Sequence, residues 1–199
     1  EGNKSSFCCD DVSKDKCKTK QITKVPYTVK RSGVYTFCHD LVLPPSTDGA
    51  NAITIKEGVS DVEIDFAGYS LSMDAKSTTA DNNGVFINAT CENIVIKNGT
   101  IEGFSASQIR GLDRLNTIQV SDMVLKGIGQ DRGGQRMVNE AFTSGVNFGP
   151  AVEEVIFAPD PSIVSNNISL NNLTINNIYL ENLAIADQAA WAVALFSCN

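Results

Sequence analysis

A five-residue repeat of apolar side chains constrains the fold of this chain most strongly. In "NNISLNNLTINNIYLENLAIAD", residues 166–187, two apolar residues separated by one spacer alternate with two polar residues. The apolar pairs are Ile168/Leu170, Leu173/Ile175, Ile178/Leu180 and Leu183/Ile185. On an α-helix, at about 100° per residue, these side chains would scatter around the whole circumference. The repeat therefore argues against a long amphipathic helix.

The polar pairs in this repeat predict corners in the chain path. In one straight strand, side chains alternate with period two, so Ile168 and Leu170 would share a face and Leu173 would point to the other. All the apolar pairs can face one core only if the chain turns at each polar pair. Those pairs are Asn171-Asn172, Asn176-Asn177 and Glu181-Asn182. Asparagine enters the left-handed region at low cost, so short strands with asparagine corners, as in a β-solenoid coil, are predicted.

Three earlier stretches follow a similar plan. They are "AITIKEGVSDVEIDFAGYSLSM" (52–73), "GVFINATCENIVIKNGTIEGF" (84–104) and "NTIQVSDMVLKGIG" (116–129). Val62 aligns with Ile94 at an offset of 32 residues, which includes a polar loop. A further stretch, "YTVKRSGVYTFCHDLVL" (27–43), alternates like a hairpin or two short strands around Ser32-Gly33. Repeats of this size cannot bury their apolar faces alone, so we expect stacked coils.

Together these stretches resemble the right-handed parallel β-helix of the pectin-lyase-like superfamily, over residues 25–199. The lead-in at 27–43 is similar to that of secreted and virion-surface β-helix proteins. The resemblance implies an all-β solenoid, a right-handed parallel β-helix, after a Cys-rich N-terminal segment at 1–24. It implies architecture rather than activity, because the fold hosts lyases, hydrolases, adhesins and fibre proteins.

One long inserted loop is predicted at about residues 130–162, which are rich in Gly and Pro and lack a steady period. Such a loop either carries function or covers an exposed side of the coils. In the second case Met137, Phe142 and Phe148 would pack over that side.

Cysteine usage predicts an oxidising compartment. The six cysteines form an even set without the C-x-x-C spacing of zinc or thioredoxin-type sites. They are Cys8, Cys9, Cys17, Cys38, Cys91 and Cys198. Three disulfides are predicted, with their pairing open, and the alternative is buried reduced thiols in a cytosolic protein.

Sequons point in the same direction. Asn-x-Ser/Thr occurs at Asn3, Asn88, Asn98, Asn167 and Asn172. Asn88 and Asn98 are the better predicted acceptors because turn residues flank them, whereas Asn167 and Asn172 would alternatively be corner asparagines facing a neighbouring coil. A secreted glycoprotein, extracellular or on a virion surface, is expected. The longest apolar run, "AAWAVALF" (189–196), is too short to span a bilayer.

Charge is distributed unevenly along the chain. Residues 1–32 have a net charge of +4 and the remaining residues a net charge of −11, which together give the total of −7. An acidic body argues against nucleic acid as a partner, because phosphate binding needs a basic face. The basic segment either touches an anionic polymer or is a solvated charge run.

The motifs of a polygalacturonase-like hydrolase are missing. That family carries Asn-Thr-Asp, Asp-Asp, Gly-His-Gly and Arg-Ile-Lys motifs, which supply the carboxylate pair that hydrolysis requires. Here Asn116-Thr117 is followed by Ile118, and the Asp10-Asp11 pair precedes the coils. The single histidine, His39, is not flanked by glycines and is interpreted as a surface residue.

A pectate-lyase-like site would need acidic ligands for calcium and an arginine that takes a proton. Asp61, Glu63 and Asp65 alternate along one predicted strand and would face outward together, and two arginines lie in "RGLDRLN" (110–116). The candidate catalytic residues are therefore Asp61, Asp65, Arg110 and Arg114. The alternative is a solvated acidic face and a loop salt bridge. Neither a cofactor nor a metal ligand set is predicted.

The sequence favours a non-enzymatic role as a structural or adhesive building block of a filament, cell wall or virion surface. The alternatives are a polysaccharide-active lyase or hydrolase with an unrecognised acidic site, and a carbohydrate-binding module, which the sparse aromatic residues disfavour.

Self-association is expected at the last predicted strand, "WAVALFSCN" (191–199), where Trp191, Val193 and Leu195 alternate. An open strand edge is a template for another chain, so head-to-tail stacking is expected, with Cys198 pairing to an N-terminal cysteine of a neighbour. The alternative is a longer chain whose later coils cover this edge.

Overall fold

The computed structural model describes residues 19–44, 49–73, 82–112, 114–126, 143–148, 166–176 and 190–195. Every regular element within these ranges is a β-strand, so the described part of the chain is all-β, as predicted. The strands are β1 (Thr19–Ile22), β2 (Tyr27–Val29), β3 (Gly33–Phe37), β4 (Leu41–Leu43), β5 (Ala50–Ile55), β6 (Ser60–Asp65), β7 (Ser70–Met73), β8 (Asn82–Ile87), β9 (Glu92–Glu102), β10 (Ser107–Gly111), β11 (Asn116–Lys126), β12 (Thr143–Phe148), β13 (Asn166–Asn176) and β14 (Ala190–Leu195).

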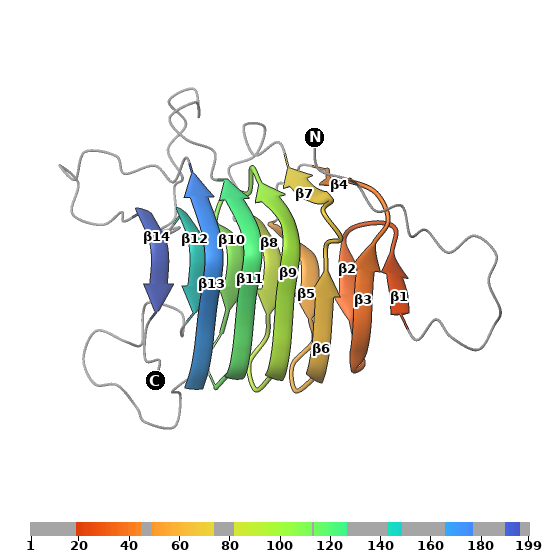
Figure 1. The fold of residues 1–199 in the computed structure, drawn as a ribbon, viewed down its shortest axis with the longest axis vertical. Coiled ribbons are helices and arrows are strands. Elements are labelled where there is room, and N and C mark those ends of the chain that lie inside the picture. The colour runs from red at the N-terminus through yellow and green to blue at the C-terminus, as the bar shows by residue number, and fades with distance from the viewer. Residues whose placement is uncertain are drawn as a thin grey trace.

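The strands form two parallel sheets that lie one behind the other (Figure 1). Sheet A has the order β1-β3-β6-β9-β11-β13, with β4 paired to β7 and β7 paired to β9. Sheet B has the order β14-β12-β10-β8-β5-β2. Successive strands along the chain alternate between the two sheets, except where β3 is followed by β4 and β6 by β7, which all belong to sheet A. This arrangement is compatible with a β-helix or solenoid-like fold.

The strand register agrees with the sequence repeat. Val62 of β6 pairs with Ile94 of β9, at the predicted offset of 32 residues. Ile94 pairs with Ile118 of β11, and Ile118 pairs with Ile168 of β13. The strands of the repeats recognised in the sequence therefore pair in the predicted order.

A left-handed residue in the middle of each of the three long strands of sheet A bends the strand, and β9 and β11 have a second one near their starts, Asn93 and Thr117. The residues at the bends are Asn98 in β9, Asp122 in β11 and Asn172 in β13, with φ of 60°, 54° and 48°. Pairing continues on both sides of the bend, and β6 and β7 pair with the two halves of β9. The predicted corner at Asn171-Asn172 is confirmed. The corners predicted at 176–177 and 181–182 lie partly or wholly outside the described residues.

The bend explains the five-residue repeat. In β11, Ile118 and Val120 are buried before Asp122, and Met123 and Leu125 are buried after it. The inward period of two is thus shifted by one residue at the left-handed corner, which keeps both apolar pairs on the core side. Asn and Asp suit this position because their short polar side chains tolerate the left-handed region.

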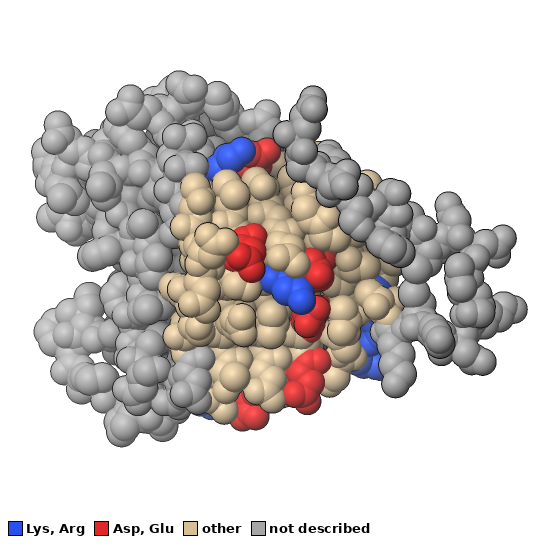
Figure 2. Space-filling model, in the orientation of Figure 1, with Lys and Arg blue, Asp and Glu red and all other residues tan. Residues whose placement is uncertain are grey.

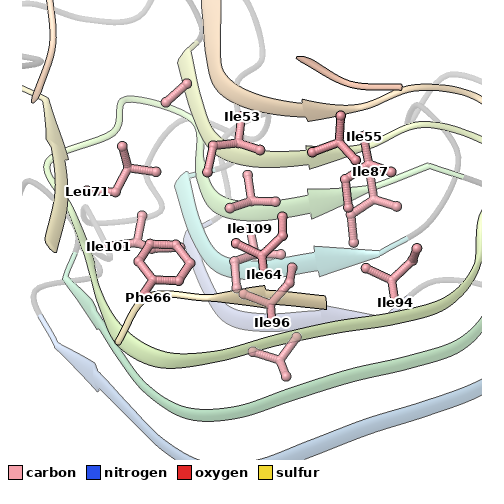
Figure 3. Packing of buried hydrophobic residues seen from close by; sticks show 14 of the residues in the cluster. Ile53, Ile55, Ile64, Phe66, Leu71, Ile87, Ile94, Ile96, Ile101 and Ile109 are labelled. Atoms are coloured by element: carbon pink, nitrogen blue, oxygen red, sulfur yellow. The ribbon is translucent and has the colours of Figure 1, made fainter. Parts of the chain in front are cut away.

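The core lies between the two sheets (Figure 3). Ile53, Ile87 and Ile109 of sheet B point toward Ile64 and Ile96 of sheet A, and all five are 0% exposed. A fully buried aliphatic side chain of this size contributes about 1.5–3 kcal/mol of transfer free energy, so the stacked rows supply the main stabilisation.

An aromatic pair fills the corner between β6 and β7. The rings of Phe37 and Phe66 stack with centroids 4.3 Å apart and an interplanar angle of 14°. Gly99 of the next coil lies against this pair: a Cβ atom there would overlap Phe66 Cβ and lie 2.7 Å from the Tyr69 carbonyl oxygen. A glycine is therefore required after the Asn98 corner for steric reasons.

Of the two alternatives for the segment 27–43, the structure has separate short strands and not a hairpin, because β2 belongs to sheet B and β3 to sheet A. Two details depart from the sequence interpretation. Strand β1 lies within the predicted N-terminal segment 1–24 yet pairs with β3. Strand β12 lies within the predicted loop 130–162 yet joins sheet B between β10 and β14. Its alternation is too short to stand out among the surrounding glycines and prolines. The rest of that loop, including Met137 and Phe142, lies outside the described residues.

Candidate functional site

The acidic row on β6 is the best candidate site that the sequence offered. Val62 and Ile64 point into the core, so the alternate residues Asp61, Glu63 and Asp65 lie together on the outer face of sheet A, as expected. Figure 2 shows acidic surface near the centre of this face with a basic side chain between.

Each carboxylate in the row has a partner. Lys97 of β9 reaches across the sheet, with Nζ 2.9 Å from Glu63 Oε1 and 3.8 Å from Asp65 Oδ2. The hydrogen bond to Glu63 raises the pKa of Lys97. Asp61 Oδ1 accepts a hydrogen bond of 2.9 Å from Asn93 Nδ2.

Asp65 is also part of the chain turn. Its Oδ1 accepts hydrogen bonds from the Ala67 backbone N–H at 2.8 Å and from Asn98 Nδ2 at 3.2 Å. These contacts hold the corner between β6 and β7 and tie it to the corner of β9. The side chain therefore serves the turn itself, in the manner of an Asx turn.

The acidic row is arranged for cross-strand pairing. A lysine between two carboxylates neutralises the charge that a divalent cation would need. Within the described ranges, no group of three or more His, Cys, Asp or Glu side chains is placed to hold a metal ion.

One of the two candidate arginines, Arg110, lies on the other sheet. Arg110 lies on β10 of sheet B, next to the inward Ile109, so its side chain leaves the opposite side of the core from Asp61 and Asp65. Arg114 forms a corner with φ of 55° before β11. Arg110 is therefore separated from Asp61 and Asp65 by the core, because sequence proximity to a coil does not say which sheet a strand joins. A shared site of Asp61, Asp65, Arg110 and Arg114 stays a prediction.

The histidine lies on an exposed corner between β3 and β4. Its Nδ1 is 3.6 Å from Cys38 Sγ, and the neighbouring Asp40 Oδ1 accepts a hydrogen bond of 2.8 Å from the Ser70 N–H. His39 is therefore a surface residue, as interpreted from the sequence.

Cys91 departs from the disulfide prediction. Its thiol is free and 0% exposed, and Sγ lies 3.4 Å from the Lys56 carbonyl oxygen. Burial raises the pKa of this thiol. Cys91 therefore acts as a small apolar core residue. The disulfides of Cys8, Cys9, Cys17 and Cys198 fall outside the described residues.

Two predicted glycan acceptors occupy equivalent corners. Asn98 and Asn172 are both exposed, and their Nδ2 atoms donate to Asp65 and Asp122 of the preceding coil, the second at 2.6 Å. Asn98 is thus a corner asparagine as much as Asn172 is, which the sequence did not distinguish. Asn88 is partly exposed, Asn167 lies in β13, and Asn3 is outside the described residues.

A buried polar ladder was missed by the sequence interpretation. Asn82 Oδ1 accepts a hydrogen bond of 2.7 Å from the Ala50 N–H, and the Asn82 N–H donates to Ser105 Oγ at 2.8 Å. Asn83 Nδ2 donates to Asn51 Oδ1 at 2.9 Å. These contacts satisfy backbone and amide groups where sheet A passes into sheet B. Asn82 and Asn83 belong to the polar loop that the sequence interpretation placed between two coils, although their 32-residue offset from Ala50 and Asn51 was a usable signal.

Comparisons with known proteins leave the site without a relative. No family model, curated protein or solved structure matches the chain. The described ranges also contain no helix of the length and apolarity that crossing a membrane requires.

Proposed function

We propose that this chain is a right-handed parallel β-helix of the pectin-lyase-like kind that acts as a non-enzymatic building block of an extracellular assembly. The assembly would be a filament, a cell wall or a virion surface, and the chain would carry an N-linked glycan at the Asn88 sequon. The parallel sheets with in-register corners support this architecture.

The observation that carries the proposal is that polar side chains on sheet A form hydrogen bonds between neighbouring strands. Successive coils are linked by Asn93 to Asp61, Asn98 to Asp65 and Asn172 to Asp122. A catalytic carboxylate needs at least one oxygen directed at substrate and a partner group across the reacting bond. Carboxylates committed to inter-coil bonds favour a structural role.

The sheet ends support assembly by stacking. Among the described strands, β1 and β2 end the two sheets on one side, and β13 and β14 end them on the other. Because every pairing is parallel, a second copy translated along the stack presents strands of the correct direction for continuing both sheets. Head-to-tail self-association of this kind generates a filament unless the rotation closes a ring.

The enzymatic alternative has weaker support. Polysaccharide lyase or hydrolase chemistry would require the acidic row and an arginine or second carboxylate on one face, and Arg110 leaves the other sheet. Electron microscopy of the purified protein, together with an assay on polygalacturonate, separates the two functions. We expect filaments or ordered particles and no reducing ends released. Monomeric protein that degrades the polymer would refute the proposal.

A further inference from the structure

The first turn of the fold gathers positive charge that has no ion-pair partner among the described residues. Lys20 of β1, Lys30 and Arg31 between β2 and β3, and Lys56 after β5 are all exposed. We call these four residues the basic corner. Within the described part of the chain, Lys97 and Lys126 form ion pairs, whereas none of the four does.

Strand register brings these charges together. The Lys56 N–H donates to the Val29 carbonyl oxygen at 3.0 Å, which places Lys56 beside Lys30 in the neighbouring coil. Adjacent strands are about 4.8 Å apart, so the two lysines are cross-strand neighbours of like charge. Such a pair is unfavourable in isolation, and Glu57 is the acidic residue that follows on the same corner.

The Lys20 and Tyr35 side chains hold the backbone of the basic corner in place. Lys20 Nζ donates to the Ser32 carbonyl oxygen at 2.9 Å and lies 4.7 Å from the centroid of the Tyr35 ring. Tyr35 Oη donates to the Arg31 carbonyl oxygen at 2.7 Å. Gly33, with φ of 136°, leaves room for the Lys20 ammonium, since a Cβ atom there would lie 3.3 Å from Nζ. The corner is thus pre-organised before any ligand arrives.

We propose that the basic corner binds anionic groups of a polysaccharide, carboxylate or sulfate, and so anchors the chain to a wall or surface. Ammonium and guanidinium groups of separate coils suit an anion that repeats along a polymer. This inference rests on the proposed adhesive role and names its ligand class. Basic surface is visible in Figure 2 on the side where β1 and β3 lie.

Nucleic acid fits the corner less well. A phosphate backbone binds over a wide basic face. Here acidic side chains limit the basic surface, with Glu57 on the same corner and Asp61 and Glu63 on β6. The Tyr35 ring is 2% exposed and covered by Lys20, so it offers no face for stacking a base.

The test compares two variants with the same change in net charge. One replaces Lys30, Arg31 and Lys56 with Gln, and Lys20 is kept because it packs on Tyr35. The control replaces Lys97, Arg114 and Lys126 with Gln. Binding to immobilised heparin, polygalacturonate and single-stranded DNA is measured by surface plasmon resonance at several salt concentrations, after circular dichroism confirms that both variants fold.

We expect salt-sensitive binding of heparin or polygalacturonate that weakens about tenfold or more in the corner variant and less than about twofold in the control. Equal loss in both variants, no binding of either polysaccharide, or tighter binding of DNA than of both would overturn the inference. Assembly into particles without polysaccharide binding would refute this inference and leave the proposed function standing. Binding accompanied by cleavage of polygalacturonate would support this inference and refute the proposed non-enzymatic function.

Discussion

Asp122 offers the sharpest test of the corner mechanism. It is exposed, has φ of 54°, and its Oδ1 accepts a hydrogen bond of 2.6 Å from Asn172 Nδ2. Replacing Asp122 with Ala, Gly or Asn separates the contribution of the left-handed backbone to stability from the contribution of the hydrogen bond. Only Asn keeps both an amide oxygen acceptor and tolerance of the left-handed region.

The expected magnitudes follow from these two contributions. A side chain without that tolerance costs about 1–2 kcal/mol in the left-handed conformation. Losing the exposed hydrogen bond costs about 0.5–1 kcal/mol. Asp122→Ala should therefore lower the free energy of unfolding by about 2 kcal/mol. Asp122→Gly should lower it by about 1 kcal/mol, through the lost bond and a more flexible unfolded chain. Asp122→Asn should change it by less than about 0.5 kcal/mol.

Urea unfolding followed by circular dichroism measures the series, with the same protein preparation and salt concentration for each variant. For a chain of this size, 2 kcal/mol corresponds to a fall in Tm of about 4–8 °C. The order of stability should be Asn, then Gly, then Ala. If the Ala variant were as stable as the Asn variant, the left-handed corner would carry no energetic weight and the explanation of the repeat would fail.

Three further outcomes are expected. Gly99→Ala should destabilise the fold by about 3 kcal/mol because its Cβ atom would overlap Phe66. Gly68→Ala, where the Cβ atom would enter open space at a φ of 84°, should cost about 1 kcal/mol. Equal urea midpoints for the two variants would contradict the close packing of Gly99 on Phe66. Cys91 should resist iodoacetamide in the folded protein and react in denaturant, and a peptide map that shows it in a disulfide would contradict its burial. Lys97→Gln should lower the free energy of unfolding by about 0.5 kcal/mol at pH 8, and unfolding curves should show this difference disappearing as the pH rises above 10.5. A lysine whose pKa is higher in the folded than in the unfolded chain stabilises the fold below the unfolded-state pKa, and this stabilisation is lost as the pH rises through the folded-state pKa. A difference that stays constant with pH would refute the ion pair.

The candidate site was partly predictable. Alternation along one strand was enough to place Asp61, Glu63 and Asp65 on one outer face, because side-chain direction in a strand depends only on period two. The partner of that row, Lys97, comes from a strand 32 residues later and follows only from register. The fate of Cys91 likewise depends on burial, which a cysteine count cannot give.

By itself, the sequence determined the strand character, the order of the repeats and the asparagine corner at 171–172, because these follow from local periodicity and from which residues tolerate left-handed backbone. Only the tertiary structure decided which strands share a sheet. It placed Arg110 on the sheet opposite the acidic row, drew β12 out of an irregular segment, and stacked Lys56 beside Lys30. The physical reason is that parallel pairing joins residues distant in the chain, so a side chain's neighbours are fixed by the lengths of the intervening connections, which no local pattern encodes.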